Sequence, residues 1–138
     1  ALKEVGLEGR EKTYPGQLSG GMRQRVALAR VFVTSPKVLL MDEPFGALDA
    51  QTRVAMHEIL LRIWEGHRTT VLFVTHDVDE ALILSDRAHI MSAGPGRIIE
   101  TMDVTQERPR HVDNIGPDFL KARNHIIRLL RQPGAEDH

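Results

Sequence analysis

Apolar residues in the first part of the chain follow a helical period. One face of the segment after Ser19 carries apolar residues at i, i+4, i+7 and i+11, namely Met22, Val26, Ala29 and Val33. Ser19 is suited to be the N-cap, because its hydroxyl can accept a hydrogen bond from a free N–H of the first turn. Ser35-Pro36 stops the pattern. A helix is therefore predicted over about residues 21–34.

Two short apolar runs, 38–41 and 70–74, are too short for helices and are predicted as strands. Their unbroken apolar character is typical of strands buried on both faces in a parallel sheet. Between them, Met56, Leu60 and Ile63 mark a helix over about residues 50–65.

The second half of the chain begins with Asp77 and Glu80 at the spacing of a helix-capping box. The runs 88–92 and 97–100 flank a Gly-Pro-Gly turn and predict a hairpin. A last helix is expected over about 117–131, with Phe119, Ile126 and Leu130 on a side that we interpret as packed on the core rather than as a partner site. Strands interleaved with helices indicate an α/β layered fold.

Composition narrows the possible functions. The chain has 138 residues, a net charge of −1 and no cysteine, which excludes a disulfide scaffold, Cys-ligated zinc and a Cys nucleophile. Its near-neutral charge argues against nucleic-acid binding driven by electrostatics. It has no run of about 20 apolar residues, so we expect no membrane span. The first residue is Ala1 rather than Met, which we interpret as a possible truncation.

The first candidate site is segment 18–25, which reads LSGGMRQR. A hydroxyl and two glycines at a helix N-terminus favour anions, because unpaired N–H groups and the positive end of the helix dipole meet there. An ordinary loop and helix cap has the same residues.

The second candidate is the pair Asp42-Glu43, where the first apolar strand ends. Ligands bind at the carboxyl ends of strands in α/β sheets, where one carboxylate can hold Mg2+ and another can orient or deprotonate a water. The alternative is a charged pair that ends a strand before Pro44.

The third candidate is His76, directly after the second apolar strand and beside Asp77. It could donate a hydrogen bond to a phosphate, or it could be an ordinary loop residue. The other six histidines show no such placement after a strand and are assigned to solvent. No pair of them has a convincing metal-ligand spacing with a carboxylate partner on the same element.

In this order, these segments resemble the ATP-binding subunits of ABC transporters. Segment 18–25 is similar to the signature motif, 38–42 to Walker B with Glu43 in the place of the catalytic glutamate, 47–49 to the D-loop, and His76 to the switch histidine. The four motifs lie within the 58 residues from Ser19 to His76. The sequences of segments 14–17, 42–53, 63–64 and 94–98 further resemble those of importer ATPases for nitrate, sulfonates and taurine.

The resemblance implies a P-loop NTPase-like layered fold and a dimer of ATPase subunits with ATP and Mg2+ sandwiched between them. Asp42 would bind Mg2+ through water, Glu43 would polarise the attacking water, and His76 would contact the γ-phosphate of the same subunit's ATP. The remaining nucleotide-binding residues are Ser19, Gly20, Gly21, Gln24 and Asp49. The first three would contact the ATP of the other subunit, and Asp49 would bridge the two sites.

The implied partners are transmembrane permease subunits and, indirectly, a periplasmic substrate-binding protein, with no nucleic acid. The implied location is peripheral, on the cytoplasmic face of a bacterial inner membrane. Cargo would be a small anion or nutrient such as nitrate, a sulfonate or taurine, which the ATPase itself does not touch.

The chain contains no P-loop, which needs Gly-x-x-x-x-Gly-Lys followed by Ser or Thr. None of its four lysines follows a glycine. We therefore expect an incomplete fold, the carboxyl-terminal part of an ABC ATPase domain that is inactive alone. Its expected parts are a signature-motif helical segment (1–36), a catalytic core with Walker B, D-loop and H-loop (37–100), and a tail with a helix (101–138). Two alternatives stay open: a non-transport ABC-superfamily ATPase of DNA repair or chromosome organisation, and a non-enzymatic remnant that acts as an interaction module.

Overall fold

The computed structural model describes residues 20–104, 110 and 116–131 of the chain. The predicted N-cap Ser19 lies outside the described residues. The chain divides between Val74 and Thr75 into two compact units, each of which is described below by itself. The division into three segments by motif remains a prediction.

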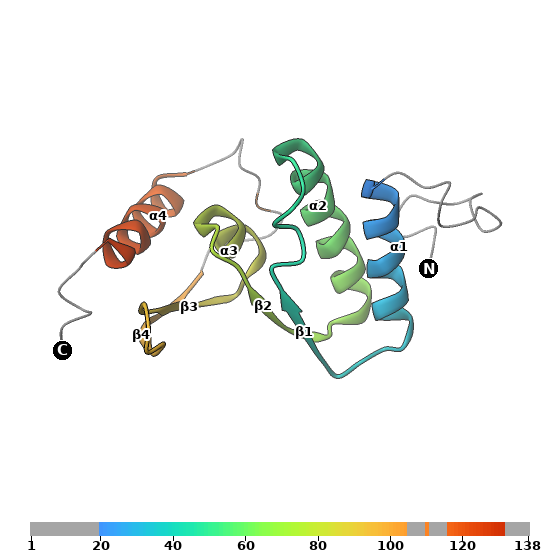
Figure 1. The fold of residues 1–138 in the computed structure, drawn as a ribbon, viewed down its shortest axis with the longest axis horizontal. Helices are drawn as coiled ribbons and strands as arrows, with labels where there is room; N and C mark the ends of the chain where they lie inside the picture. The colour runs from blue at the N-terminus through green and yellow to red at the C-terminus, as the bar shows by residue number, and fades with distance from the viewer. Residues whose placement is uncertain (1–19, 105–109, 111–115, 132–138) are drawn as a thin grey trace. The chain divides into compact units, whose positions relative to one another are not determined.

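The first unit contains helix α1 (Gly20–Val33), strand β1 (Val38–Asp42), helix α2 (Ala50–His67) and strand β2 (Thr70–Val74) (Figure 1). The strands pair in parallel, from Val38 opposite Thr70 to Asp42 opposite Val74. All four elements lie within two residues of the positions that the periodicity predicts. The α/β architecture expected from the sequence is confirmed.

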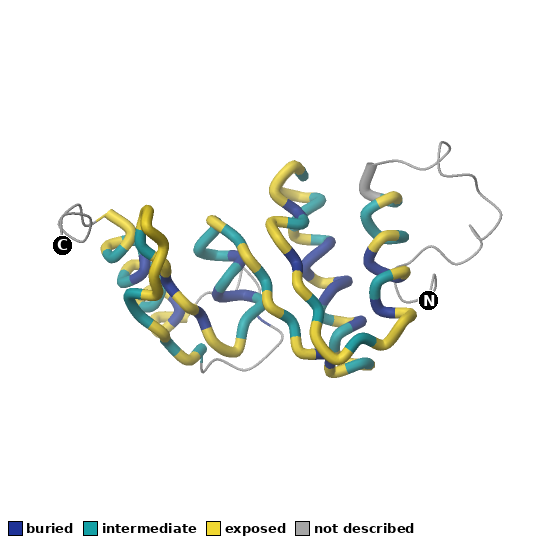
Figure 2. The backbone as a smooth tube through the Cα atoms, turned by 60° about the horizontal axis from the view of Figure 1, so that its bottom comes forward, coloured by how far each residue is buried: buried dark blue, intermediate teal, exposed yellow. Residues whose placement is uncertain are grey.

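Helices α1 and α2 lie side by side and share an apolar core (Figures 1 and 2). The ring of Phe32 on α1 lies 5.7 Å from that of His67 on α2, measured between centroids. Strand β1 contributes Met41 to the buried side chains. The other buried apolar residues of the two helices are Leu28 and Ala29 on α1 and Met56, Ile59, Leu60 and Ile63 on α2.

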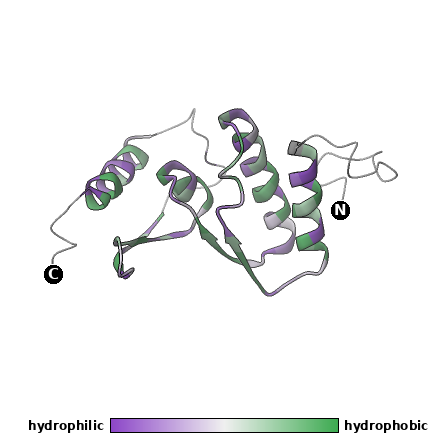
Figure 3. Ribbon diagram, in the orientation of Figure 1, coloured by the Kyte–Doolittle hydropathy of each residue, from purple (hydrophilic) through white to green (hydrophobic). Residues whose placement is uncertain are grey.

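The prediction that both strands are buried on both faces is wrong. Strands β1 and β2 are mostly hydrophobic, apart from Asp42 and Thr70 (Figure 3). Alternate residues are nevertheless exposed, by 68% at Val38, 66% at Leu40, 56% at Leu72 and 45% at Val74. The reason is that both helices of this unit lie on one side of the strand pair (Figure 1). Because side chains alternate along a strand, the helices cover one of its faces only.

The second unit contains helix α3 (Val78–Leu84), strands β3 (Arg87–Met91) and β4 (Ile98–Asp103), and helix α4 (Pro117–Leu130). The strands form the predicted antiparallel hairpin, from Arg87 opposite Asp103 to Met91 opposite Ile98, with an irregularity between Ile90 and Met91. No helix within the described ranges is long and apolar enough to cross a membrane.

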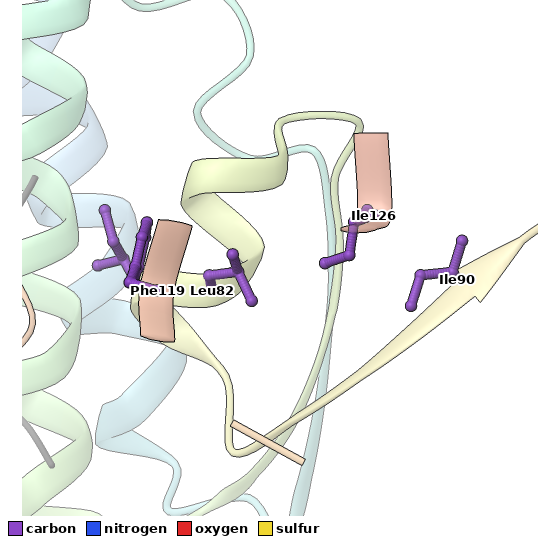
Figure 4. Close-up of a cluster of buried hydrophobic side chains, with 5 residues drawn as sticks. Leu82, Ile90, Phe119 and Ile126 are labelled. Atoms are coloured by element: carbon purple, nitrogen blue, oxygen red, sulfur yellow. The ribbon is translucent and has the colours of Figure 1, made fainter. Parts of the chain in front are cut away.

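The core of the second unit joins α3, β3 and α4. It consists of Leu82, Ile83, Ile90, Phe119 and Ile126 (Figure 4). Phe119 and Ile126 are buried as predicted, but Leu130 is 53% exposed, which corrects its assignment to the packed face. Leu130 is the last residue of α4, and the neighbouring Leu129 packs against the cluster instead.

Polar contacts also hold α4 and Arg110 in the second unit. Arg123 Nε contacts Asp79 Oδ1 on α3 at 2.8 Å, and His125 Nε2 contacts Glu100 Oε2 on β4 at 2.6 Å. The buried guanidinium of Arg110 donates hydrogen bonds to the carbonyl oxygens of Leu82 at 3.1 Å and Ser85 at 2.5 Å. Since Leu82 and Ser85 lie at the carboxyl end of α3, Arg110 satisfies carbonyl groups that the helix itself leaves without partners.

Candidate functional site

Asp42 and Glu43 lie where β1 ends, and both side chains are exposed. The backbone N–H of Glu43 donates to the carbonyl oxygen of Val74, the last residue of β2, at 2.8 Å. Glu43 also has a φ of 45°, in the left-handed region that residues other than glycine rarely adopt. Such a conformation costs energy and persists only where the surrounding structure holds it in place. Ser35, just after α1, and Arg68, the C-cap of α2, also have positive φ.

The loop from Glu43 to Asp49 is anchored by Phe45, which is 1% exposed. Its ring lies 6.0 Å from Phe73 on β2 and 5.7 Å from His57 on α2, measured between centroids. Two turns flank this anchor, because the N–H of Gly46 donates to the Glu43 oxygen at 3.3 Å and that of Leu48 to the Phe45 oxygen at 3.1 Å. The packing of this aromatic ring thus fixes the middle of the loop that connects Glu43 to Asp49.

The assignment of His57 to solvent is wrong, since the residue is 6% exposed. It lies on the face of α2 that meets Phe45, and the burial of this ring follows from that packing. Among the other histidines in the described part of the chain, His67 and His125 are half-buried and His89 is exposed.

Asp49 is the N-cap of α2. Its carboxylate accepts hydrogen bonds from Thr52, at 2.8 Å from the backbone N–H and 3.0 Å from the hydroxyl. These bonds, the backbone one first, lower the pKa of Asp49 below its ordinary value of 3.8. Asp49 therefore caps the start of α2. Because the residue is also exposed, its carboxylate lies at the surface.

Of the predicted signature residues, Gly20 and Gly21 are the first two residues of α1, and Gln24 is a half-buried residue of the same helix. Ser19 lies outside the described residues. The N-terminal ends of α1 and α2 and the carboxyl end of β1 face the same end of the first unit (Figure 1). The structure therefore places Gly20, Gly21, Asp49 and the Asp42-Glu43 pair toward one end of this unit, where helix dipoles favour anions.

His76 belongs to the second unit, where it is exposed just before α3. Its neighbour Asp77 is the N-cap of α3, with Oδ1 accepting from the N–H of Glu80 at 3.2 Å. The Asp77 N–H in turn donates to Thr75 Oγ1 at 3.0 Å. The N-cap half of the predicted capping box is confirmed.

The donor set at Asp42 and Glu43 fits Mg2+ held with a phosphate. No group of three or more His, Asp or Glu residues that could hold a metal alone occurs in the described part of the chain. Proteins usually bind Mg2+ through one or two carboxylates together with waters and substrate phosphates. One exposed carboxylate at Asp42 is therefore sufficient when a nucleotide supplies the other oxygens.

Two residues that support this site were not singled out from the sequence. Phe45 anchors the loop, and Arg53 on α2 donates to the carbonyl oxygens of Phe45 and Leu48 at 3.3 and 2.8 Å. Some contacts near this loop can be predicted: the spacing of Asp49 and Thr52 is an ordinary N-cap signal and indicates where α2 begins. By contrast, the sequence carries no signal for the contacts that Arg53 makes.

Comparison with known proteins gives consistent matches. The family model described as ABC transporter matches residues 1–46. An uncharacterized ABC transporter ATP-binding protein of Methanocaldococcus jannaschii is 53% identical over 130 residues, which is 94% of this chain and 48% of that protein.

Two further relatives are aliphatic sulfonates import ATP-binding proteins. SsuB 2 of Streptomyces avermitilis is 49% identical over 142 residues, covering 100% of this chain and 55% of its own length. SsuB of a Bacillus cereus strain is 57% identical over 130 residues, covering 94% of this chain and 51% of its own length. The chain spans about half the length of the curated relatives that it matches.

Proposed function

We propose a function from the premise that the chain belongs to the family of ABC transporter ATP-binding proteins. The protein is the ATP-hydrolysing subunit of a membrane importer. The observation that carries this proposal is the exposed Asp42-Glu43 pair at the end of β1, fixed to β2 through the Glu43 N–H. It lies at the end of the first unit toward which α1 and α2 also turn their N-termini (Figure 1).

Asp42 and Glu43, at this end of the first unit, have different roles in ATP hydrolysis. Glu43 accepts a proton from, or orients, the water that attacks the γ-phosphate. Asp42 would hold Mg2+ directly or through water, and the ion would supply positive charge that stabilises the phosphate. The exposed carboxylates can both reach solvent, which a water-activating group requires.

The remaining predicted residues act around the nucleotide. Ser19, Gly20 and Gly21 contact the γ-phosphate of ATP bound to a second ATPase subunit, where the positive end of the α1 dipole favours anions, and Gln24 binds the nucleotide. Asp49 bridges the two nucleotide sites. His76 donates a hydrogen bond to the γ-phosphate of its own subunit's ATP.

Within the importer, the cargo is a small anion, and aliphatic sulfonates are the favoured class. The support is that two relatives, 49% and 57% identical, are named for import of aliphatic sulfonates. Nitrate and taurine are the competing cargoes. The partners are transmembrane permease subunits and, indirectly, a periplasmic substrate-binding protein, and the ATPase lies on the cytoplasmic face of the membrane.

The test is reconstitution of the full-length protein with the permease encoded beside it in membrane vesicles. We expect ATP hydrolysis that depends on Mg2+ and is stimulated by a sulfonate-loaded binding protein, and ATP-dependent uptake of the sulfonate. Uptake of nitrate or taurine alone would correct the cargo. Absence of ATP hydrolysis would overturn the function, and hydrolysis stimulated only by DNA would favour a non-transport ATPase.

The 138-residue chain by itself is expected to hydrolyse little ATP, because none of its lysines follows a glycine as the P-loop requires. Phosphate release by the purified chain, compared with the full-length protein at equal concentration, tests this. Equal turnover would show that the nucleotide is held in another way.

A further inference from the structure

We infer that Arg53 is a positioning residue, which holds the loop between Glu43 and Asp49 so that the two carboxylates keep a fixed relative placement. Its guanidinium donates through Nη2 to the carbonyl oxygen of Leu48 at 2.8 Å and through Nε to that of Phe45 at 3.3 Å. Both carbonyl groups belong to the loop, so this one side chain of α2 contacts the loop at two points.

The chemistry of the guanidinium suits this role. It is planar and always charged, and its N–H donors point in fixed directions, so two carbonyl groups bound to it cannot turn independently. A lysine has a single flexible ammonium and would not fix two carbonyl groups in the same way. Arg53 is half-buried, and both contacts are partly shielded from water, which strengthens them.

Arg53 complements the apolar anchor of the loop. The buried ring of Phe45 fixes the middle of the loop against Phe73 and His57. The Arg53 contacts fix its second half, up to the point where Asp49 begins α2. Glu43 is held at the other end by the carbonyl oxygen of Val74. These three anchors contact the loop at its start, middle and end, so both of its exposed carboxylates lie on a loop that is held along its length.

This inference rests on the proposed function, in which Glu43 and Asp49 serve the nucleotide sites. Arg53 contacts the loop rather than the nucleotide, so its loss should leave the KM for ATP nearly unchanged. A small displacement of catalytic groups can cost about 100-fold in rate. We therefore expect Arg53→Met in the full-length protein to lower kcat by about 10- to 100-fold, with the KM within about 2-fold of the unsubstituted value.

The matched control is Arg62→Met, which removes an exposed arginine from the same helix. Amide hydrogen exchange supplies a readout that is independent of activity. We expect faster exchange at Gly46 and Leu48 in Arg53→Met, with exchange in the rest of α2 and in β1 unchanged. Arg53→Lys, which keeps the charge but not the planar fork, should recover only part of kcat and part of the protection.

The inference is overturned if Arg53→Met and Arg62→Met have the same kcat and the same exchange at Gly46 and Leu48. It is also overturned if exchange rises uniformly over the whole first unit, since Arg53 would then support the fold in general. If Arg53→Met does not fold, Arg53→Lys decides by the same two measurements. If the unsubstituted protein hydrolyses no ATP, the proposed function fails, while exchange at Gly46 and Leu48 still shows whether Arg53 holds the loop.

Discussion

The backbone N–H of Glu43 donates a hydrogen bond to the carbonyl oxygen of Val74 at 2.8 Å. Glu43 follows the last residue of β1, and Val74 is the last residue of β2, so this bond continues the contact between the strands beyond their paired residues. The chain turns away at this point with a φ of 45°. The Glu43 carboxylate is therefore placed by both strands rather than by one.

The first prediction concerns Glu43 in the full-length protein. Glu43→Gln keeps the size of the side chain but removes the group that takes a proton, so kcat for ATP should fall by about 100-fold or more. ATP binding, measured by equilibrium titration, should be retained. The control is Glu65→Gln, at an exposed glutamate that pairs with Arg68 on the surface. Turnover equal to that of the control would show that Glu43 only ends a strand.

The second prediction concerns the pH dependence of the Asp49 cap. Hydrogen bonds from Thr52 lower the pKa of Asp49 from its ordinary value of 3.8, so the ionised carboxylate stabilises the folded state. This contribution is complete above the unfolded value and is lost as the pH falls through the lower folded value. The Tm difference between the unsubstituted protein and Asp49→Ala should therefore be constant near pH 7 and shrink below about pH 4.

Asp49→Ser is the matched control for the cap, because a serine hydroxyl also accepts from the first turn of a helix but does not titrate there. Its Tm difference from the alanine variant should persist in acid. A Tm difference between unsubstituted protein and Asp49→Ala that grows on acidification would contradict the sign of the pKa shift.

The third prediction concerns Arg110, whose guanidinium is buried at the carboxyl end of α3. Arg110→Met leaves the carbonyl oxygens of Leu82 and Ser85 without these donors, and should lower the free energy of unfolding by about 1–3 kcal/mol. Urea denaturation measures the change. Arg128→Met, at an exposed position in the last turn of α4, should change the unfolding free energy by less than about 0.5 kcal/mol. Equal values for both variants would rule out the role of Arg110.

The fourth prediction concerns the exposed apolar face of β1 and β2. The double variant Leu40→Thr and Leu72→Thr replaces side chains that are 66% and 56% exposed, and threonine is well suited to strands. We expect the 138-residue chain to stay monomeric to a higher concentration in light scattering, with little change in Tm. Met41→Thr, at a buried position of β1, should lower the Tm instead. Unchanged self-association of the double variant would show that this face is not what drives it.

Local periodicity was sufficient to predict the elements of the first unit, whereas for α3 the sequence indicated only the N-cap. The apolar spacing on α1 and α2 and the two short runs at 38–41 and 70–74 place helices and strands within two residues of their observed bounds. Burial could not be predicted to the same extent. A run such as Val38 to Met41 shows that residues are suited to a core, but whether a second layer covers them depends on segments elsewhere.

Individual residues show the same limit at the candidate site. The motif residues Asp42, Glu43 and Asp49 could be chosen from the sequence because their types and order are distinctive. The burial of His57 depends on a ring contact with Phe45, across a loop and two turns of helix, and no local pattern indicates it. Arg53 and Arg110 likewise donate hydrogen bonds to backbone carbonyl groups. Because every residue has such a group, the sequence does not indicate which ones these arginines bind.

The left-handed backbone at Glu43 has a consequence for how this position tolerates change. Holding a residue other than glycine in that region costs of order 1 kcal/mol or more. Glycine at position 43 would relieve this cost, because it adopts positive φ freely, and would also remove the carboxylate. Stability and turnover therefore favour different residues at position 43, and a screen that selects only for thermal resistance would select against catalysis there.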